Sequence, residues 1–213
     1  MNAVKKKRVL MSVTGVLITA VSISMFKLAA FGVDPFQTFM SGMEKLIPIS
    51  FGMLYILVNS ALLIFAFICD RHYIGIATFI NLFLLGYVVQ YCLSMLRVLF
   101  AEPSMLVRSI SFISGFILLC LGSSFYMTAD LGVSTYDAVA LIISDTWKKG
   151  EFKYIRICTD IICVVAGNVL FLSGGGSVRQ TMQLVGIGTI VTAFLMGPLI
   201  DFFNRKNYQT AIG

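Results

Sequence analysis

The chain has 213 residues, of which 58% are hydrophobic and only 12% are charged, and its mean hydropathy is +0.93. Soluble domains carry about 45–50% apolar and about 25% charged residues, so this composition predicts a chain embedded in a membrane. The formal net charge of +6 does not indicate nucleic-acid binding, because the charges are dispersed or lie at segment ends. The run Lys5-Lys6-Lys7-Arg8 precedes the first apolar segment, where a cytoplasmic topology anchor belongs.

Six apolar segments have the length of roughly 20 residues that crosses about 30 Å of hydrocarbon. We expect transmembrane helices over residues 9–31, 51–69, 74–99, 106–129, 152–172 and 182–203. The first segment contains no small-residue cleavage site, so we expect a retained helix rather than a signal peptide. The fold class predicted is an all-α integral membrane protein with the whole chain, 1–213, in one membrane domain.

Two shorter apolar segments, 35–47 and 135–146, are too short to span easily. Asp34-Pro35 offers an N-cap followed by proline at the first helical position. Ser134-Thr135-Tyr136-Asp137 has the spacing of a capping box. We therefore expect two short helices that are interfacial or re-entrant.

The chain is internally duplicated, with one copy over 9–99 and the other over 106–203. Five positions of the first copy recur 100 residues later: Gly15, Ser24, Ala29, Gly32 and Val33 become Gly115, Ser124, Ala129, Gly132 and Val133. Residues 74–90 also align without gaps to 185–201, with six of 17 positions identical. Duplication in an apolar chain is typical of transport folds, in which the site forms between the halves.

The number of crossings decides the orientation of the copies. With six crossings the copies are inverted, and ten Lys and Arg residues lie inside, at 5–8, 71, 148, 149, 153, 205 and 206. With eight crossings the copies are parallel, and only Arg71 and Arg179 lie outside. Charge bias favours eight crossings and segment length favours six; we expect six, because charge bias is weighted towards the first helix. Both arrangements place the two termini in the cytoplasm.

Polar residues within apolar spans are the candidate site, since each needs a partner or a wet cavity. Asp160 follows Arg156 by one helical turn, and aligning the copies places Asn59 opposite Asp160. The pair fits a coupling-ion or substrate contact, although an Arg156–Asp160 ion pair near the membrane interface is the favoured alternative.

The remaining candidates lie at segment ends or on small-residue faces. Asp34 and Asp137 suit helix capping, and helix N-termini gathered between the copies also suit an anion site. Lys27 and Asp130 precede the Gly-Val breaks, where Lys27 reaches the interface. Thr78 and Thr189 follow Gly75 and Gly186 at matched points, where helix packing is favoured over ligand contact.

No arrangement of nucleophile, base and orienting group appears, so we expect no enzymatic activity. The five cysteines lie within apolar segments, and His72 is the one histidine. We expect no metal site and no cofactor.

Three motifs carry a family resemblance: FGVDPFQTFMSGM (31–43), LGVSTYDAVALII (131–143) and VGIGTIVTAFLMGPLID (185–201). They resemble the YczE/YyaS/YitT group of bacterial multi-pass membrane proteins, and the YczE-like branch in particular. The resemblance implies a bacterial cytoplasmic-membrane protein and carries no established activity.

Two functions fit these observations. The first is a transporter or permease of a small molecule or ion, and the second is a membrane scaffold or regulatory subunit that acts through helix contacts. We expect the lipid bilayer as a partner and no nucleic acid. A homo-oligomer is a further prediction, because the small-residue face at Gly186 and Gly188 suits packing between protomers.

Overall fold

The computed structural model describes residues 3–129, 131–178, 180–181 and 185–212. Within these residues five helices are long and apolar enough to cross a membrane: α1 (Ala3–Ala29), α3 (Phe51–Cys69), α4 (Ile76–Leu99), α5 (Met105–Thr128) and α7 (Phe152–Ser173). The last helix, α9 (Ile187–Ile212), has a shorter apolar part, Ile187–Ile200. The expected all-helical membrane fold is therefore confirmed.

The two short helices form where their starting residues predict them. In α2 (Pro35–Leu46) the Asp34 carboxylate accepts the Gln37 N–H at 3.2 Å. In α6 (Thr135–Leu141), which continues as the π-helical turn η2 (Ile142–Thr146), Ser134 Oγ accepts the Asp137 N–H at 3.1 Å. At 12 residues α2 is about 18 Å long, well short of the hydrocarbon thickness.

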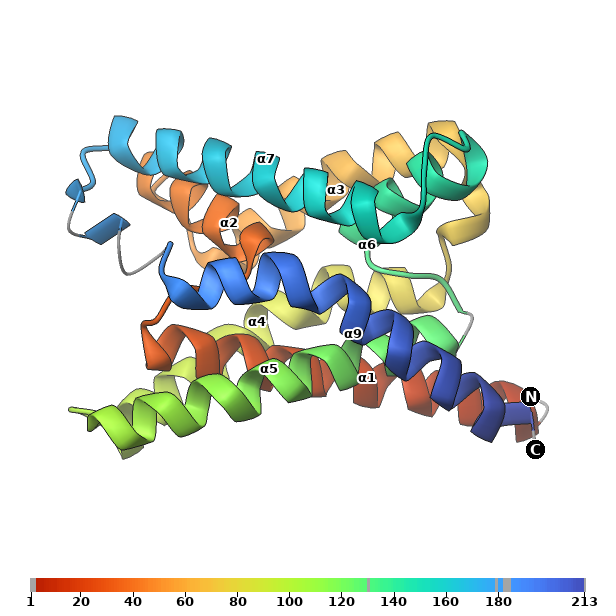
Figure 1. Cartoon of the computed structure of the whole chain (residues 1–213), viewed down its shortest axis with the longest axis horizontal. Coiled ribbons are helices and arrows are strands. Elements are labelled where there is room, and N and C mark those ends of the chain that lie inside the picture. Colours follow the sequence, from red (N-terminus) through yellow and green to blue (C-terminus); the bar gives the residue numbers. More distant parts are fainter. Residues whose placement is uncertain (1–2, 130, 179, 182–184, 213) are drawn as a thin grey trace.

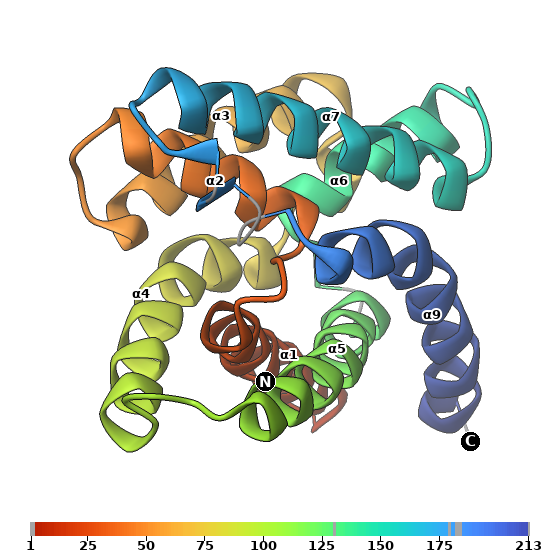
Figure 2. The same cartoon turned by 60° about the vertical axis from the view of Figure 1, so that its left-hand side comes forward.

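The helices lie in two layers (Figure 1). One layer contains α2, α3, α6 and α7. In the other, α1 and α5 lie side by side between α4 and α9 (Figure 2). A hydrogen bond of 2.6 Å from Ser22 Oγ to the Gly115 carbonyl joins α1 to α5. Each layer thus combines helices from the first and second halves of the chain, instead of one bundle per half.

The first turn of α1 and the last turn of α9 lie at the same end of the molecule, which we call the N/C end; the opposite end is the distal end (Figure 1). α2 and α6 both begin near the middle and run towards opposite ends. At the distal end Lys45 of α2 lies against Gly174, and at the N/C end Trp147, just after η2, packs edge-on against Phe65.

The turns after α1 and α5 are held by the other half of the chain. Gly32 has a φ of 109° and Gly132 a φ of 99°, values that favour glycine. Two backbone hydrogen bonds of 2.9 Å hold these turns, one from Ala77 N–H to the Leu131 carbonyl and one from Gly188 N–H to the Phe31 carbonyl. The contacts are reciprocal, since a first-half helix binds the second-half turn and a second-half helix binds the first-half turn.

Candidate functional site

A buried group of charges lies in the middle of the molecule, where α6 meets α7. Arg156 forms an ion pair with Asp137 of α6, and its Nε lies 3.3 Å from Asp160 Oδ1. The three side chains are at most 5% exposed. The expected Arg156–Asp160 pair therefore exists, is buried within the protein and extends to another helix; its position relative to the membrane interface stays a prediction.

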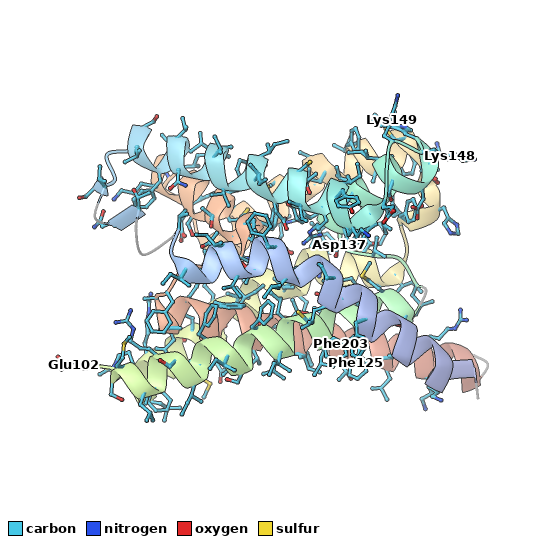
Figure 3. The ribbon with its side chains drawn as sticks, in the orientation of Figure 1. Glu102, Phe125, Asp137, Lys148, Lys149 and Phe203 are labelled. Atoms are coloured by element: carbon cyan, nitrogen blue, oxygen red, sulfur yellow. The ribbon has the colours of Figure 1, made fainter. Side chains whose placement is uncertain are left out.

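Asp137 is the most heavily bonded carboxylate of this group. It accepts hydrogen bonds from the Tyr126 hydroxyl, from Ser134 Oγ at 2.6 Å, and from Arg156. Figure 3 shows Asp137 inside the molecule, whereas Glu102, Lys148 and Lys149 lie at its ends. The predicted capping role accounts for the contact with Ser134 but not for those with Tyr126 and Arg156.

Asp160 connects the charges to the facing starts of the two short helices. Its Oδ1 accepts a hydrogen bond of 2.6 Å from the Tyr136 hydroxyl. The Tyr136 ring stacks on Phe36 with centroids 4.7 Å apart, and the Arg156 guanidinium lies 4.3 Å from the Tyr136 ring centre. The N-terminal turns of α2 and α6 thus meet beside the buried ion pairs.

Asn59 joins the same network through the residue before Tyr136. Thr135 donates a hydrogen bond to Asn59 Oδ1, and Asn59 Nδ2 donates to the Tyr55 carbonyl at 2.8 Å. The Tyr55 hydroxyl then donates to Asn81 Oδ1 at 3.0 Å. Asn59 and Asp160, which the sequence alignment placed opposite each other, therefore contact successive residues of α6.

Beside this network lies a small cavity of about 50 Å³, which we call the central cavity. Helices from both halves line it, and Asp34, Asp137 and Arg156 supply charged atoms to its wall. Asp34 is 7% exposed and caps α2, as its sequence context predicts. One wall of the cavity is thus formed where the cap of α2 faces α6.

A larger cavity of about 770 Å³, which we call the vestibule, lies among the C-terminal ends of α1, α2 and α4, on the distal side. Three cations, Lys27, Lys45 and Arg97, line it against one carboxylate, Glu44. The Lys27 ammonium lies 3.6 Å from the centre of the Phe51 ring. The vestibule therefore combines an aromatic wall with an excess of positive charge.

The vestibule and the central cavity follow each other along the same helices. On α3 and α4 the vestibule is lined by Phe51 and Val89, and the central cavity by residues one turn deeper, Tyr55 and Leu85. Phe51, Val89 and Phe26 are at most 3% exposed. These three apolar side chains thus form a layer on the side of the vestibule that faces the central cavity.

The N/C end is held by an apolar cluster and by a surface hydrogen bond. A buried apolar cluster fills the interior on that side, with Tyr126 and Ile142 as its largest members. At the surface the Thr146 hydroxyl donates to Asp70 at 2.7 Å and ties η2 to the turn after α3. This hydrogen bond, together with one from the His72 N–H, holds the pKa of the Asp70 carboxyl below its usual value.

The other predicted site residues lie away from the ion pairs. Thr78 Oγ1 donates to the Val133 carbonyl at 2.8 Å, and Thr189 packs against Gly32, so neither lines the central cavity or the vestibule. Asp130 lies outside the described residues. Gly186 and Gly188 contact Phe31 of the same chain, and the homo-oligomer stays a prediction.

Sequence reasoning did not identify Tyr126, Tyr136 or Gln37 as site residues. The 100-residue repeat contains a signal for two of them, because Phe36 matches Tyr136 and Gln37 matches Asp137. Matched positions at the starts of the two short helices meet in the structure, as the stacked rings of Phe36 and Tyr136 illustrate.

Comparison with known proteins supports the resemblance drawn from the three motifs. The chain is 26% identical to the "Uncharacterized protein YyaS" of Bacillus subtilis (strain 168) over 189 residues, which cover 89% of this chain and 88% of that protein. No solved structure matches the chain. Residues 6–205 match the family of unknown function DUF6198. The chain therefore belongs to the DUF6198 family and is of the YyaS type.

Proposed function

We propose that this integral membrane protein is a small-molecule transporter whose halves are inverted repeats with three crossings each. The observation that carries the proposal is the buried group Asp137–Arg156–Asp160, placed where the starts of α2 and α6 meet. Charges inside a membrane protein are expensive and mark substrate or ion pathways. In transporters built from repeats, sites of this kind lie between the repeats at the ends of discontinuous helices.

The two cavities support a pathway through this group. The vestibule reaches inwards from the distal end, and the central cavity begins one helical turn further along α3 and α4. Phe26, Phe51 and Val89 line the vestibule on the side of the central cavity and are at most 3% exposed. Movement of this apolar layer would connect the vestibule to the central cavity while the cluster at the N/C end stays packed.

The charge of the vestibule favours an anionic solute. Three cations against one carboxylate raise the local concentration of anions. With the N/C end in the cytoplasm, as the basic residues near both termini favour, the vestibule faces away from the cytoplasm. We therefore propose an acidic small molecule as the solute.

The test is solute flux in proteoliposomes. Vesicles containing the purified chain are incubated with the low-molecular-weight fraction of a bacterial extract, and mass spectrometry identifies the solutes that accumulate. We expect Asp160→Asn and Asn59→Ala to lower the flux by about tenfold or more, because the first removes a charge paired with Arg156 and the second leaves the Thr135 hydroxyl without its acceptor. The matched control is Ser109→Ala, which removes an exposed hydroxyl bonded only to its own helix.

Accumulation no greater than in empty vesicles would contradict the transporter proposal and favour the membrane scaffold. Equal flux in Asp160→Asn, Asn59→Ala and the control would contradict the assignment of the site.

A further inference from the structure

The central cavity contains buried oxygen atoms that the protein does not satisfy. Among the described residues, Thr19 Oγ1, Asp34 Oδ2 and Gln37 Oε1 are buried and have no hydrogen-bond partner. Their residues are 6%, 7% and 2% exposed, and all three line this one cavity. Arg156, which lines the same cavity, has an Nε without a hydrogen bond, but this atom lies 3.3 Å from Asp160 Oδ1 in an ion pair. Buried polar groups are normally bonded, so the three remaining oxygens indicate that something else occupies the space.

The charge of the region indicates what kind of occupant is needed. Asp137 and Asp160 share one guanidinium, that of Arg156, and the Asp34 carboxylate lines the same cavity as Arg156 without an ion pair to it. Asp34 has only the backbone N–H of Gln37 as its partner. A water molecule would satisfy hydrogen bonds but would bring no positive charge to the Asp34 carboxylate, and a buried charge without an ion pair is costly. A cation satisfies the oxygens and the charge together.

The donor atoms and the size of the cavity select the class of cation. A hydroxyl, a carboxylate and an amide carbonyl are hard oxygen ligands, which suit hard metal cations. The single free carboxylate balances one positive charge. A space of about 50 Å³ is close to the share of one or two water molecules in the liquid and suits a single small cation.

We propose that the central cavity binds one monovalent alkali cation through Thr19, Asp34 and Gln37, and Na⁺ is the ion to test first. The role of this ion as the coupling ion rests on the transporter proposed above; its binding does not. Thr19 belongs to α1 and the other two ligands to the start of α2, so the ion joins a long helix to a short one. Binding then holds the turn between them in one geometry.

The test compares the thermal unfolding of the purified full chain in NaCl and in choline chloride at equal ionic strength. We expect saturable stabilisation by Na⁺, with Asp34→Asn raising the apparent Kd by about tenfold or more. Thr19→Val, which removes one hydroxyl and keeps the shape, weakens binding without the risk of unfolding the cap of α2. Asp145→Asn, in η2 and outside the cavity, is the control and retains the wild-type Na⁺ response.

The same unfolding temperature of the wild-type chain in both salts would overturn the cation site. Stabilisation by acid that does not depend on Na⁺ would also overturn it, because it would indicate a proton on Asp34. Na⁺ binding in a chain without flux would leave the site standing and refute the transporter. Flux that ignores a Na⁺ gradient while binding persists would refute the coupling role alone.

Discussion

Replacing Arg156 with methionine tests the buried charges at the middle of the molecule. The substitution keeps most of the side-chain volume and removes the one cation that Asp137 and Asp160 share. Breaking a buried ion pair from one side costs about 3–5 kcal/mol, because the remaining charge loses its partner. In this variant two carboxylates, each at most 4% exposed, lose their cationic partner. We therefore expect a loss of stability at the upper end of that range.

A second substitution separates lost charge balance from lost packing. Asp137→Asn alone leaves Arg156 paired with Asp160 and should cost less, about 1–3 kcal/mol. Added to Arg156→Met, it removes one of the two uncompensated carboxylates, so the double variant should be more stable than Arg156→Met alone. If packing caused the loss, the double variant would be less stable.

The assay is reversible unfolding in mixed detergent micelles, followed by circular dichroism. The control is Lys153→Met on the same helix, which breaks an exposed pair with Glu151 and should leave stability unchanged. A loss below about 1 kcal/mol for Arg156→Met, no greater than for an exposed pair, would refute the reasoning.

Three further substitutions test the rest of the account. Gly132→Ala should destabilise the chain by about 1–3 kcal/mol in the same unfolding assay, because φ is 99° there and a Cβ would lie 2.4 Å from a backbone nitrogen. Gly175→Ala should cost less, because Gly175 has a similar φ of 81° but open space around it. Equal losses for the two variants would contradict the packing argument. Thr78→Val should cost about 1 kcal/mol in that assay, since it removes the hydrogen bond to the Val133 carbonyl, and Thr78→Ser should restore most of it. Arg97→Gln should raise the KM for an acidic solute in proteoliposomes and leave kcat unchanged, because Arg97 lines the vestibule and not the central cavity; a change in kcat alone would contradict its place there.

The local features of this fold follow from the sequence. Asp34 and Ser134 start the short helices because their side chains accept the N–H groups left free in the first turn. Gly32 and Gly132 mark the turns because few other residues adopt their φ angles. Each of these outcomes depends on residues within a few positions of one another.

The site itself depends on contacts that local patterns do not contain. Tyr126 donates to Asp137, and Asn59 accepts from Thr135 of the other half, 76 positions away. The sequence therefore did not predict the pairing of Arg156 with Asp137, which lies on another helix. It predicted Asp160, four residues after Arg156, as the partner. The sequence signal that comes nearest to this site is the residue-by-residue match of the two repeats at the short helices.

The opposite orientation of the two halves is the central claim, and thiol accessibility tests it most directly. In a variant whose five cysteines are replaced, Arg71→Cys places a thiol next to Asp70, which is hydrogen-bonded to η2 at the N/C end, and Glu102→Cys places one at the distal end. A membrane-impermeant reagent added to intact cells should label Glu102→Cys, and should label Arg71→Cys only after the cells are opened. Labelling of Arg71→Cys but not Glu102→Cys in intact cells, as parallel halves with eight crossings require, would contradict the account.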